Sequence, residues 1–262
     1  MVTLITAKDE EHVDYRLISR LRRCISCDLY SYVQSILRLC RPHEDFTAGD
    51  INRAEQEMIY PGGKGINVSL VLGNLHIPSK MLGFVAGFTG REIERLAKIN
   101  GGDTDFITLD EGCSRINLKV SADDETAVNG MGPHIPEEKL QALLAQIDTL
   151  KAGDTLVLAG SIPSDIPDDI YEQILKRLQD RDIRVVVDAT GDLLKNVIKY
   201  RPFLIKPNNF ELGELFSVDL HTDEEIIPTT SPSMLNNMPV PCSSAGMSVA
   251  ITAHSPSKNV AL

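Results

Sequence analysis

Pro61-Gly62-Gly63-Lys64-Gly65-Ile66-Asn67-Val68 combines a glycine turn, a lysine and the start of a predicted helix. Adjacent glycines adopt backbone angles that are closed to other residues, and they let a ligand approach the main chain. The free N–H groups at the start of a helix attract anions. We interpret the stretch as a site for a polar, phosphorylated small molecule, although an ordinary turn before a helix would use the same residues. It is not a Walker loop, because neither Ser nor Thr follows the lysine and the glycine spacing differs.

The composition is ordinary for a globular protein, with 42% hydrophobic and 24% charged residues among 262. A net charge of −11 argues against a nucleic-acid partner. No apolar run is long enough to span a membrane, and the N-terminus lacks a signal-peptide core, so we expect a cytoplasmic protein without a membrane partner. An anionic ligand would need local cations, for which Lys64, Arg115 and Lys206 are candidates.

Cysteines concentrate at the two ends, where four of the five lie before residue 41 or after residue 240. Cys24 and Cys27 form a C-x-x-C pair, a pattern that serves redox chemistry or metal binding. No second pair and no nearby histidine pair completes a zinc site, so we expect no metal there. Residues 1–43 show no clean period, and residues 228–262, rich in Pro, Ser, Thr and Asn, predict a disordered tail.

Predicted strands and helices alternate from residue 80 to residue 216. Such alternation predicts a parallel sheet covered by helices on both faces, with ligands bound beyond the carboxyl ends of its strands. Gly160-Ser161, Asp188 and Lys206-Pro207-Asn208 all follow predicted strands, which favours a site at that edge. Thr89, with Glu92 three residues later, predicts a capping box at the start of a helix.

Residues 115–120 alternate between polar and apolar side chains. This period predicts a half-exposed strand that carries Arg115 and Asn117 on one face. Taken without other information, Arg115 would be interpreted as a surface residue of an edge strand.

Five motifs, in order along the chain, resemble the PfkB (ribokinase-like) sugar kinases. They are the glycine stretch at 61–68, Ser-Arg-Ile-Asn at 114–117, Glu125-Thr126 with 129–133, Ala-Gly-Ser-Ile-Pro at 159–163 and Lys-Pro-Asn-Asn-Phe-Glu at 206–211. Residues 49–53 add a resemblance to bacterial 1-phosphofructokinases, with tagatose-6-phosphate kinases as near relatives. We therefore divide the chain into a non-matching segment 1–45, a kinase core 46–227 and a non-matching tail 228–262.

The resemblance implies a ribokinase-like α/β fold, incomplete at both ends of this sequence. The fold would have three layers, α/β/α, with a mostly parallel sheet in the middle. A small β lid would come from strands near 46–60 and 115–129 and would pair two subunits as a homodimer. It also implies a phosphotransferase that uses ATP and Mg²⁺ to convert fructose 1-phosphate to fructose 1,6-bisphosphate.

The resemblance further implies roles for individual residues. Residues implied to bind the substrate, with Lys64 and Arg115 on its phosphate, are Gly62, Gly63, Lys64, Asn67, Arg115, Asn117 and Ser161. Residues implied to face the nucleotide are Asp188, Lys206, Asn208 and Glu211, with Glu211 holding Mg²⁺ through water. Three of these have simpler interpretations, since Asn208 with Glu211 also makes a capping box, and Asp188 could cap the helix after it.

Two motifs of the resembled family have no counterpart here. One is an Asn-Pro-Ser-x-Asp at the end of the first strand, whose Asp binds the sugar. The other is Gly-Ala-Gly-Asp, which supplies the anion hole and the catalytic base and occurs nowhere in the sequence. We therefore name no catalytic residue and expect no turnover from the chain as given, so that a non-catalytic remnant that binds a sugar phosphate stays open.

The unmatched ends suggest a change of reading frame. Back-translated with free codon choice and shifted one nucleotide forward, residues 28–43 can encode Ile-Tyr-Thr-Val-Thr-Phe-Asn-Pro-Ser-Leu-Asp-Tyr-Val-Val-His. We predict one insertion or deletion near codons 43–45 and a second near codons 227–238, against the alternative of a divergent terminus. The nucleotide sequence decides, because the shifted frame must encode Asn-Pro-Ser and an Asp two codons later.

Overall fold

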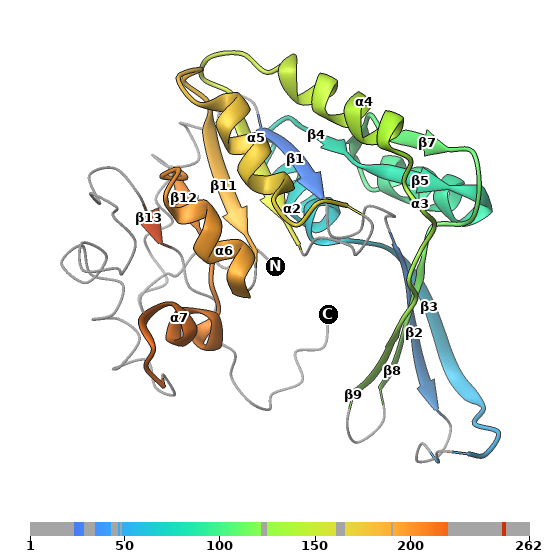
Figure 1. Cartoon of the computed structure of the whole chain (residues 1–262). Helices are drawn as coiled ribbons and strands as arrows, with labels where there is room; N and C mark the ends of the chain where they lie inside the picture. The colour runs from blue at the N-terminus through green and yellow to red at the C-terminus, as the bar shows by residue number, and fades with distance from the viewer. Residues whose placement is uncertain are drawn as a thin grey trace.

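A parallel sheet forms the centre of the molecule (Figure 1). The computed structural model describes residues 24–28, 35–42, 47, 49–121, 125–160, 166–189, 191–219 and 248–249. Among these residues, seven strands pair in the order β13-β12-β11-β10-β1-β4-β6, all parallel. Their bounds are β1 Cys24–Asp28, β4 Ser79–Leu82, β6 Asp103–Thr104, β10 Thr155–Ala159, β11 Arg184–Asp188, β12 Leu204–Ile205 and β13 Ser248–Val249.

Helices cover both faces of this sheet, which confirms the predicted three layers. Alternate residues of β10 belong to different cores: Leu156 and Leu158 pack with α4, α5 and α6, whereas Val157 packs with Leu72 of α2. A strand buried on both faces reads as a continuous apolar run. The helices are α2 Lys64–Asn74, α3 Gly87–Ile99, α4 Glu137–Asp148, α5 Ile170–Leu178, α6 Gly191–Ile198 and α7 Asn209–Phe216.

The predicted helix after Pro136 shows how sequence period sets this packing. Leu140, Leu143, Leu144 and Ile147 recur at helical spacing and are all buried in the larger core. A short parallel pair, β5 Phe84–Ala86 and β7 Ile107–Leu109, extends the strand layer beneath α4. In the part of the chain that the structure describes, no helix is both long and apolar enough to cross a membrane.

A small β lid projects from the body of the molecule, at the lower right of Figure 1. Its strands pair in the order β3-β2-β8-β9. Their bounds are β2 Ser35–Pro42, β3 Ala54–Gly62, β8 Ile116–Ser121 and β9 Glu125–Asn129. β3 ends at Gly62 and α2 begins at Lys64, so the glycine turn joins the lid directly to the first turn of α2.

Three strands lie where the sequence period indicated none. β1 lies between β10 and β4, and β2 lies between β3 and β8, although both fall within residues 1–43. β1 reads Cys-Ile-Ser-Cys-Asp, a mixture that lacks the apolar run expected of a central strand. β13 falls within 228–262 and pairs with β12, whereas the rest of that predicted tail lies outside the described residues.

Candidate functional site

The carboxyl ends of neighbouring strands bring polar groups to one edge of the sheet. The register aligns Asp28 of β1 with Ala159 of β10 and Asp188 of β11. Beyond that row, the Gly160 N–H donates to the Asp188 carbonyl oxygen at 2.8 Å, and the Lys206 N–H donates to the Val187 carbonyl oxygen at 2.9 Å. Asp188 and Lys206 therefore lie side by side where ligands of such sheets bind.

Two lysines converge on one buried carboxylate at this edge. Lys64 Nζ lies 3.1 Å from Asp188 Oδ1, and Lys206 Nζ lies 3.2 Å from the same oxygen. The Asp188 side chain is 11% exposed, against 41% for Lys64. Gly63, with φ 128°, turns the chain into α2 and so delivers Lys64 to the sheet edge. The structure thus joins a residue predicted for the sugar phosphate to two predicted for the nucleotide.

Asn208 and Glu211 form the capping box that the sequence left open as a simpler interpretation. The Glu211 N–H donates to Asn208 Oδ1 at 2.8 Å, and the Asn208 N–H donates to Glu211 Oε2 at 2.7 Å. Burial raises the pKa of Glu211, and the Asp188 charge raises it further. The Asn208 N–H, Lys64 and Lys206 oppose that rise in pKa. Glu211 therefore belongs electrostatically to the same cluster, while its carboxylate also holds the start of α7.

The lid register places the glycine turn and Arg115 at the same end of the lid sheet. Ser35 pairs with Gly62, and the next residue of β2, Ile36, pairs with Ile116, which follows Arg115. Gly62 and Arg115 thus flank β2, about 10 Å apart at two strand spacings. β8 lies between β2 and β9, so the interpretation of Arg115 as part of an edge strand is wrong.

The three remaining predicted site residues are Asn67, Asn117 and Ser161. Asn117 pairs with Asn129 across the lid, on the strand face that Arg115 also shares. Asn67 lies on the exposed side of α2, and its N–H donates to the Gly63 carbonyl oxygen at 3.0 Å. Ser161 lies outside the described residues. Their binding roles stay predictions.

One supporting residue was missed by the sequence analysis. The buried Tyr171 of α5 donates its hydroxyl to the Gly160 carbonyl oxygen at 3.3 Å, and so fixes the end of β10. Its period within the apolar face of α5 indicates only a core residue, and no sequence signal distinguishes a tyrosine that also holds a strand end.

The donor set fits Mg²⁺ that is bound mainly through a nucleotide. Among the described residues, no three His, Cys, Asp or Glu side chains form a metal-binding group. Magnesium in kinase sites uses one or two carboxylates together with phosphates and water. Asp188 and Glu211 supply two carboxylates, and Lys64 and Lys206 supply the cations that phosphates need.

Comparisons with known proteins agree with this geometry. The family model described as pfkB family carbohydrate kinase matches residues 28–251. The 1-phosphofructokinase of Bacillus subtilis is 46% identical over 185 residues, which cover 71% of this chain and 61% of the relative. A Bacillus licheniformis protein named D-tagatose-1-phosphate kinase is 36% identical over 177 residues, 68% of this chain and 58% of the relative.

Solved structures show the same fold. The phosphofructokinase-2 of Escherichia coli, in complex with substrates and products, has a TM-score of 0.77 at 21% identity, and the match covers 88% of this chain and 73% of that one. The chain spans about three fifths of the length of the curated relatives it matches.

Proposed function

Because the chain belongs to the pfkB family of carbohydrate kinases, we propose that its site serves the transfer of the ATP γ-phosphate to fructose 1-phosphate, giving fructose 1,6-bisphosphate. The observation that carries this proposal is the convergence of Lys64 and Lys206 on Asp188. Phosphoryl transfer depends mainly on positioning and on stabilising the charge of the phosphoryl group. Lys64 and Lys206 bring two positive charges to the place where that charge would lie.

The sugar phosphate would bind between the lid and the first turn of α2. Lys64 and Arg115 would hold its phosphate, because both belong to segments that meet at the base of the lid sheet. An arginine offers a planar fork of donors that matches phosphate geometry. Backbone groups of Gly62 and Gly63, with the side chains of Asn67 and Asn117, would bind the sugar hydroxyls.

The nucleotide would lie along the carboxyl edge of β11 and β12. Lys206 would contact its phosphates, while Asp188, Asn208 and Glu211 would hold Mg²⁺ through water. Mg²⁺ held there would neutralise negative charge on the nucleotide phosphates. Lys64 touches Asp188 at 3.1 Å, so the cluster itself connects the two proposed ligand sites.

A second ketose phosphate is a specific alternative. The sequence suggested tagatose 6-phosphate, and relatives named D-tagatose-1-phosphate kinase favour the 1-phosphate. Fructose and tagatose differ in configuration at a single carbon, so the same phosphate ligands would serve both. The choice therefore depends on contacts with one hydroxyl group rather than on Lys64 or Arg115.

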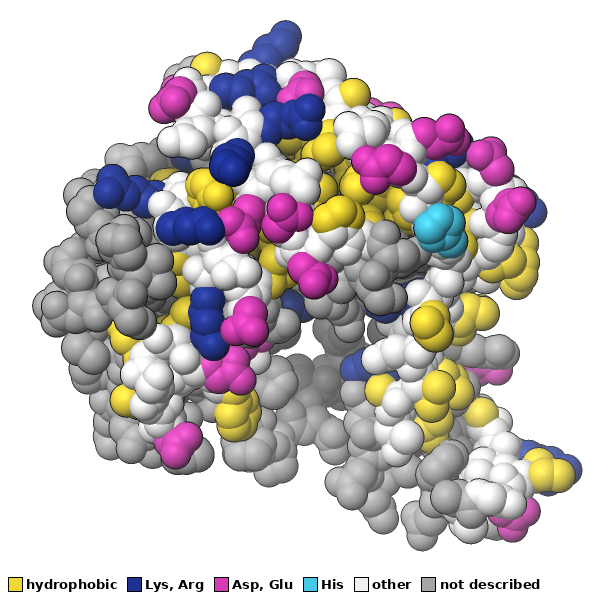
Figure 2. All heavy atoms as spheres, viewed as in Figure 1, with side chains coloured by type: hydrophobic (Ala, Val, Ile, Leu, Met, Phe, Trp, Pro, Cys, Tyr) yellow, Lys and Arg dark blue, Asp and Glu magenta, His cyan; other side chains and the backbone are white. Residues whose placement is uncertain are grey.

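We also propose that the lid pairs two copies of the chain. The register puts Ile59, Arg38, Leu118 and Val128 in one row, so these four residues share one face of the lid. Ile116, two residues before Leu118, lies on that face too. Figure 2 shows hydrophobic side chains at the surface of the lid. Ile59, Ile116 and Val128 are 48%, 43% and 60% exposed. Exposed apolar side chains that gather on one face are stabilised when a second copy covers them.

The test is transfer of labelled γ-phosphate from ATP. Fructose 1-phosphate, tagatose 1-phosphate, tagatose 6-phosphate and fructose 6-phosphate are offered separately, with the Bacillus subtilis 1-phosphofructokinase as positive control. Any label in fructose 1,6-bisphosphate should lie below the control by about a hundredfold or more for each missing function, because the base and anion-hole motif does not occur in this sequence. Binding of fructose 1-phosphate without transfer supports the non-catalytic alternative. The proposal is contradicted if the chain neither binds nor phosphorylates any of the four sugars.

A further inference from the structure

A buried hydroxyl pair fastens the segment that enters lid strand β8. Thr89, in the first turn of α3, and Ser114, one residue before Arg115, are each 1% exposed. Thr89 Oγ1 donates to the Ser114 carbonyl oxygen at 2.7 Å. The predicted capping box is wrong, because α3 starts at Gly87, three residues earlier than a cap at Thr89 requires. Thr89 Oγ1 also lies 3.4 Å from the Ala86 carbonyl oxygen, a second acceptor next to the Ser114 carbonyl.

Ser114 is held through all three of its polar groups. Its N–H donates to the Ala86 carbonyl oxygen at 2.9 Å, and its Oγ accepts the Ala86 N–H at 2.9 Å. Its carbonyl oxygen receives the Thr89 hydroxyl. Together these bonds tie the residue before Arg115 to the junction between β5 and α3, which belongs to the body of the molecule.

Close packing makes this attachment rigid. A Cβ at Gly90 would lie 3.1 Å from Ser114 Oγ and 2.9 Å from Val85 Cβ, so only glycine lets α3 approach the segment this closely. Beyond Arg115, the Gly130 N–H donates to the Ile116 carbonyl oxygen at 3.1 Å. Arg115 is thus fixed on both sides, by the body before it and by the lid after it.

We infer that Thr89 and Ser114 are positioning residues that hold Arg115 at the sugar-phosphate site. This inference rests on the proposed function, because it assigns Arg115 to the phosphate. Neither hydroxyl touches substrate; both act through the backbone of residue 114. If Arg115 moves away from the phosphate, the site loses a hydrogen bond between charged groups, which lowers affinity by about tenfold or more.

The test compares three variants of the full chain. Thr89→Val removes the hydroxyl and keeps the shape, whereas Thr89→Ser restores the hydroxyl. Thr155→Val is the matched control, since Thr155 is equally buried and its Oγ1 has no hydrogen-bond partner among the residues that the structure describes. We expect Thr89→Val to weaken fructose 1-phosphate binding about tenfold or more, with ATP binding within about twofold of wild type. Thr89→Ser and Thr155→Val should bind both ligands like wild type.

A second measurement needs no ligand. The Arg115 Nε–H signal, assigned by its loss in Arg115→Lys, should shift in the nitrogen-15 spectrum of Thr89→Val and return in Thr89→Ser. If Thr89→Val does not fold, Ser114→Ala carries the same expectation. An unchanged Arg115 signal, or equal weakening of both ligands, overturns the inference. A wild-type chain that binds no ketose phosphate contradicts the proposed function instead, and the Arg115 signal still decides the positioning role.

Discussion

At the residue scale, two anionic groups compete for the ammonium group of Lys64. It pairs with Asp188 in the structure, and the proposal also assigns it to the sugar phosphate. Because Lys206 contacts the same Asp188 oxygen, the carboxylate keeps a cationic partner when Lys64 turns to a ligand. The pair therefore does not exclude the binding role.

Lys64→Ala and Arg115→Ala should each weaken ketose-phosphate binding by about 1–3 kcal/mol, as expected for the loss of a charged hydrogen bond. Calorimetric titration measures the effect. Lys195→Ala is the control, because that lysine pairs with Asp192 on the surface of α6. Unchanged affinity in both site variants would remove Lys64 and Arg115 from the site.

Glu211 gives the site a pH dependence of known sign. Burial raises the pKa of Glu211 above its ordinary value of 4.5, so the native state holds this proton more tightly than the unfolded chain. The contribution of this carboxyl to stability is full below that value and is lost as pH rises through the folded-state pKa. Glu211→Gln keeps a capping box and removes the titration.

The difference in free energy of unfolding, Glu211→Gln minus wild type, should therefore increase as pH rises from about 4.5 to about 7. Urea unfolding at several pH values measures the difference, and other titrating groups cancel in the comparison. A difference that stays constant over this range, or falls, would show that burial does not dominate the pKa of Glu211.

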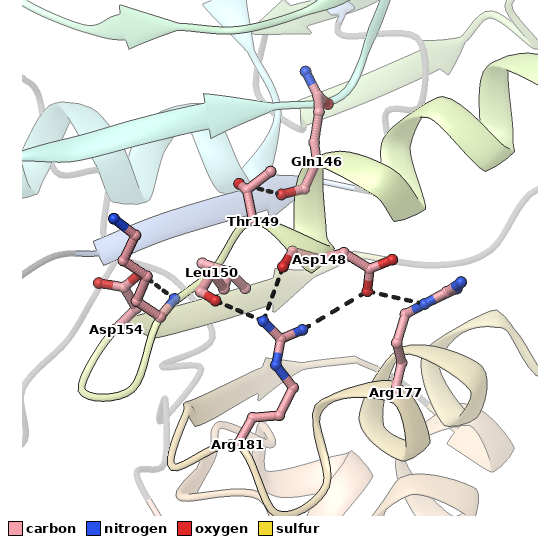
Figure 3. A network of polar contacts seen from close by, with 8 residues as sticks. Gln146, Asp148, Thr149, Leu150, Asp154, Arg177 and Arg181 are labelled. Carbon is pink, nitrogen blue, oxygen red and sulfur yellow. Dashed lines mark hydrogen bonds and ion pairs between the residues drawn. The ribbon is translucent and has the colours of Figure 1, made fainter.

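At the scale of elements, two arginines contact the connection between α4 and β10 in different ways. Arg181 donates to the carbonyl oxygens of Asp148 and Leu150 at 2.8 and 2.6 Å, at the end of α4 (Figure 3). Arg177 Nε lies 3.0 Å from the Asp148 carboxylate, and both side chains are about 40% exposed. The two arginines share a carboxylate but differ in what else they hold.

Arg181→Ala should lower the free energy of unfolding by about 1–3 kcal/mol, because it leaves two carbonyl oxygens at a helix end without their donor. Arg177→Ala should cost less than about 1 kcal/mol, as exposed ion pairs usually do. Denaturant unfolding compares the two. Equal losses in the two variants would mean that the carboxylate contact, and not the carbonyl contacts, stabilises this connection.

The elements that the sequence predicted carry a local pattern of apolar residues or glycines. The features that it missed depend on how distant strands pair. The apolar repeats of α4 and the glycine turn before α2 are local signals, and the structure has both elements. The Lys64–Asp188 pair joins residues 124 positions apart, so it depends on strand order that no local period reveals. β1 was missed because its five residues carry no apolar run, although they lie in the middle of the sheet.

At the scale of the whole molecule, the proposed lid dimer can be tested by placing a charge on the lid. Val128→Glu places a charge at the β9 end of the row that holds Ile59, Leu118 and Val128, and Ala127→Glu places the same charge on the opposite face of β9. We expect Val128→Glu to shift the chain from dimer to monomer in sedimentation experiments and Ala127→Glu to leave the dimer intact. A wild-type chain that is monomeric at all concentrations contradicts the lid dimer.

The ends of the chain concern the same scale. The family match at residues 28–251 extends beyond the core of 46–227 on both sides. β2 and β13 lie within those extensions, and β1 reaches them with its last residue, Asp28. We retain the boundaries at 46 and 227 as a proposal about the reading frame, since they mark where the character of the sequence changes. They do not mark the limits of the sheet.

The most direct measurement of the central claim is the affinity of the full chain for fructose 1-phosphate, compared with fructose and with inorganic phosphate. The account predicts that fructose 1-phosphate binds most tightly, and that Lys64→Ala and Arg115→Ala bring its affinity down toward that of fructose. Equal affinity for fructose and fructose 1-phosphate would contradict the account, because the cationic cluster around Asp188 would then have no part in recognising the phosphate.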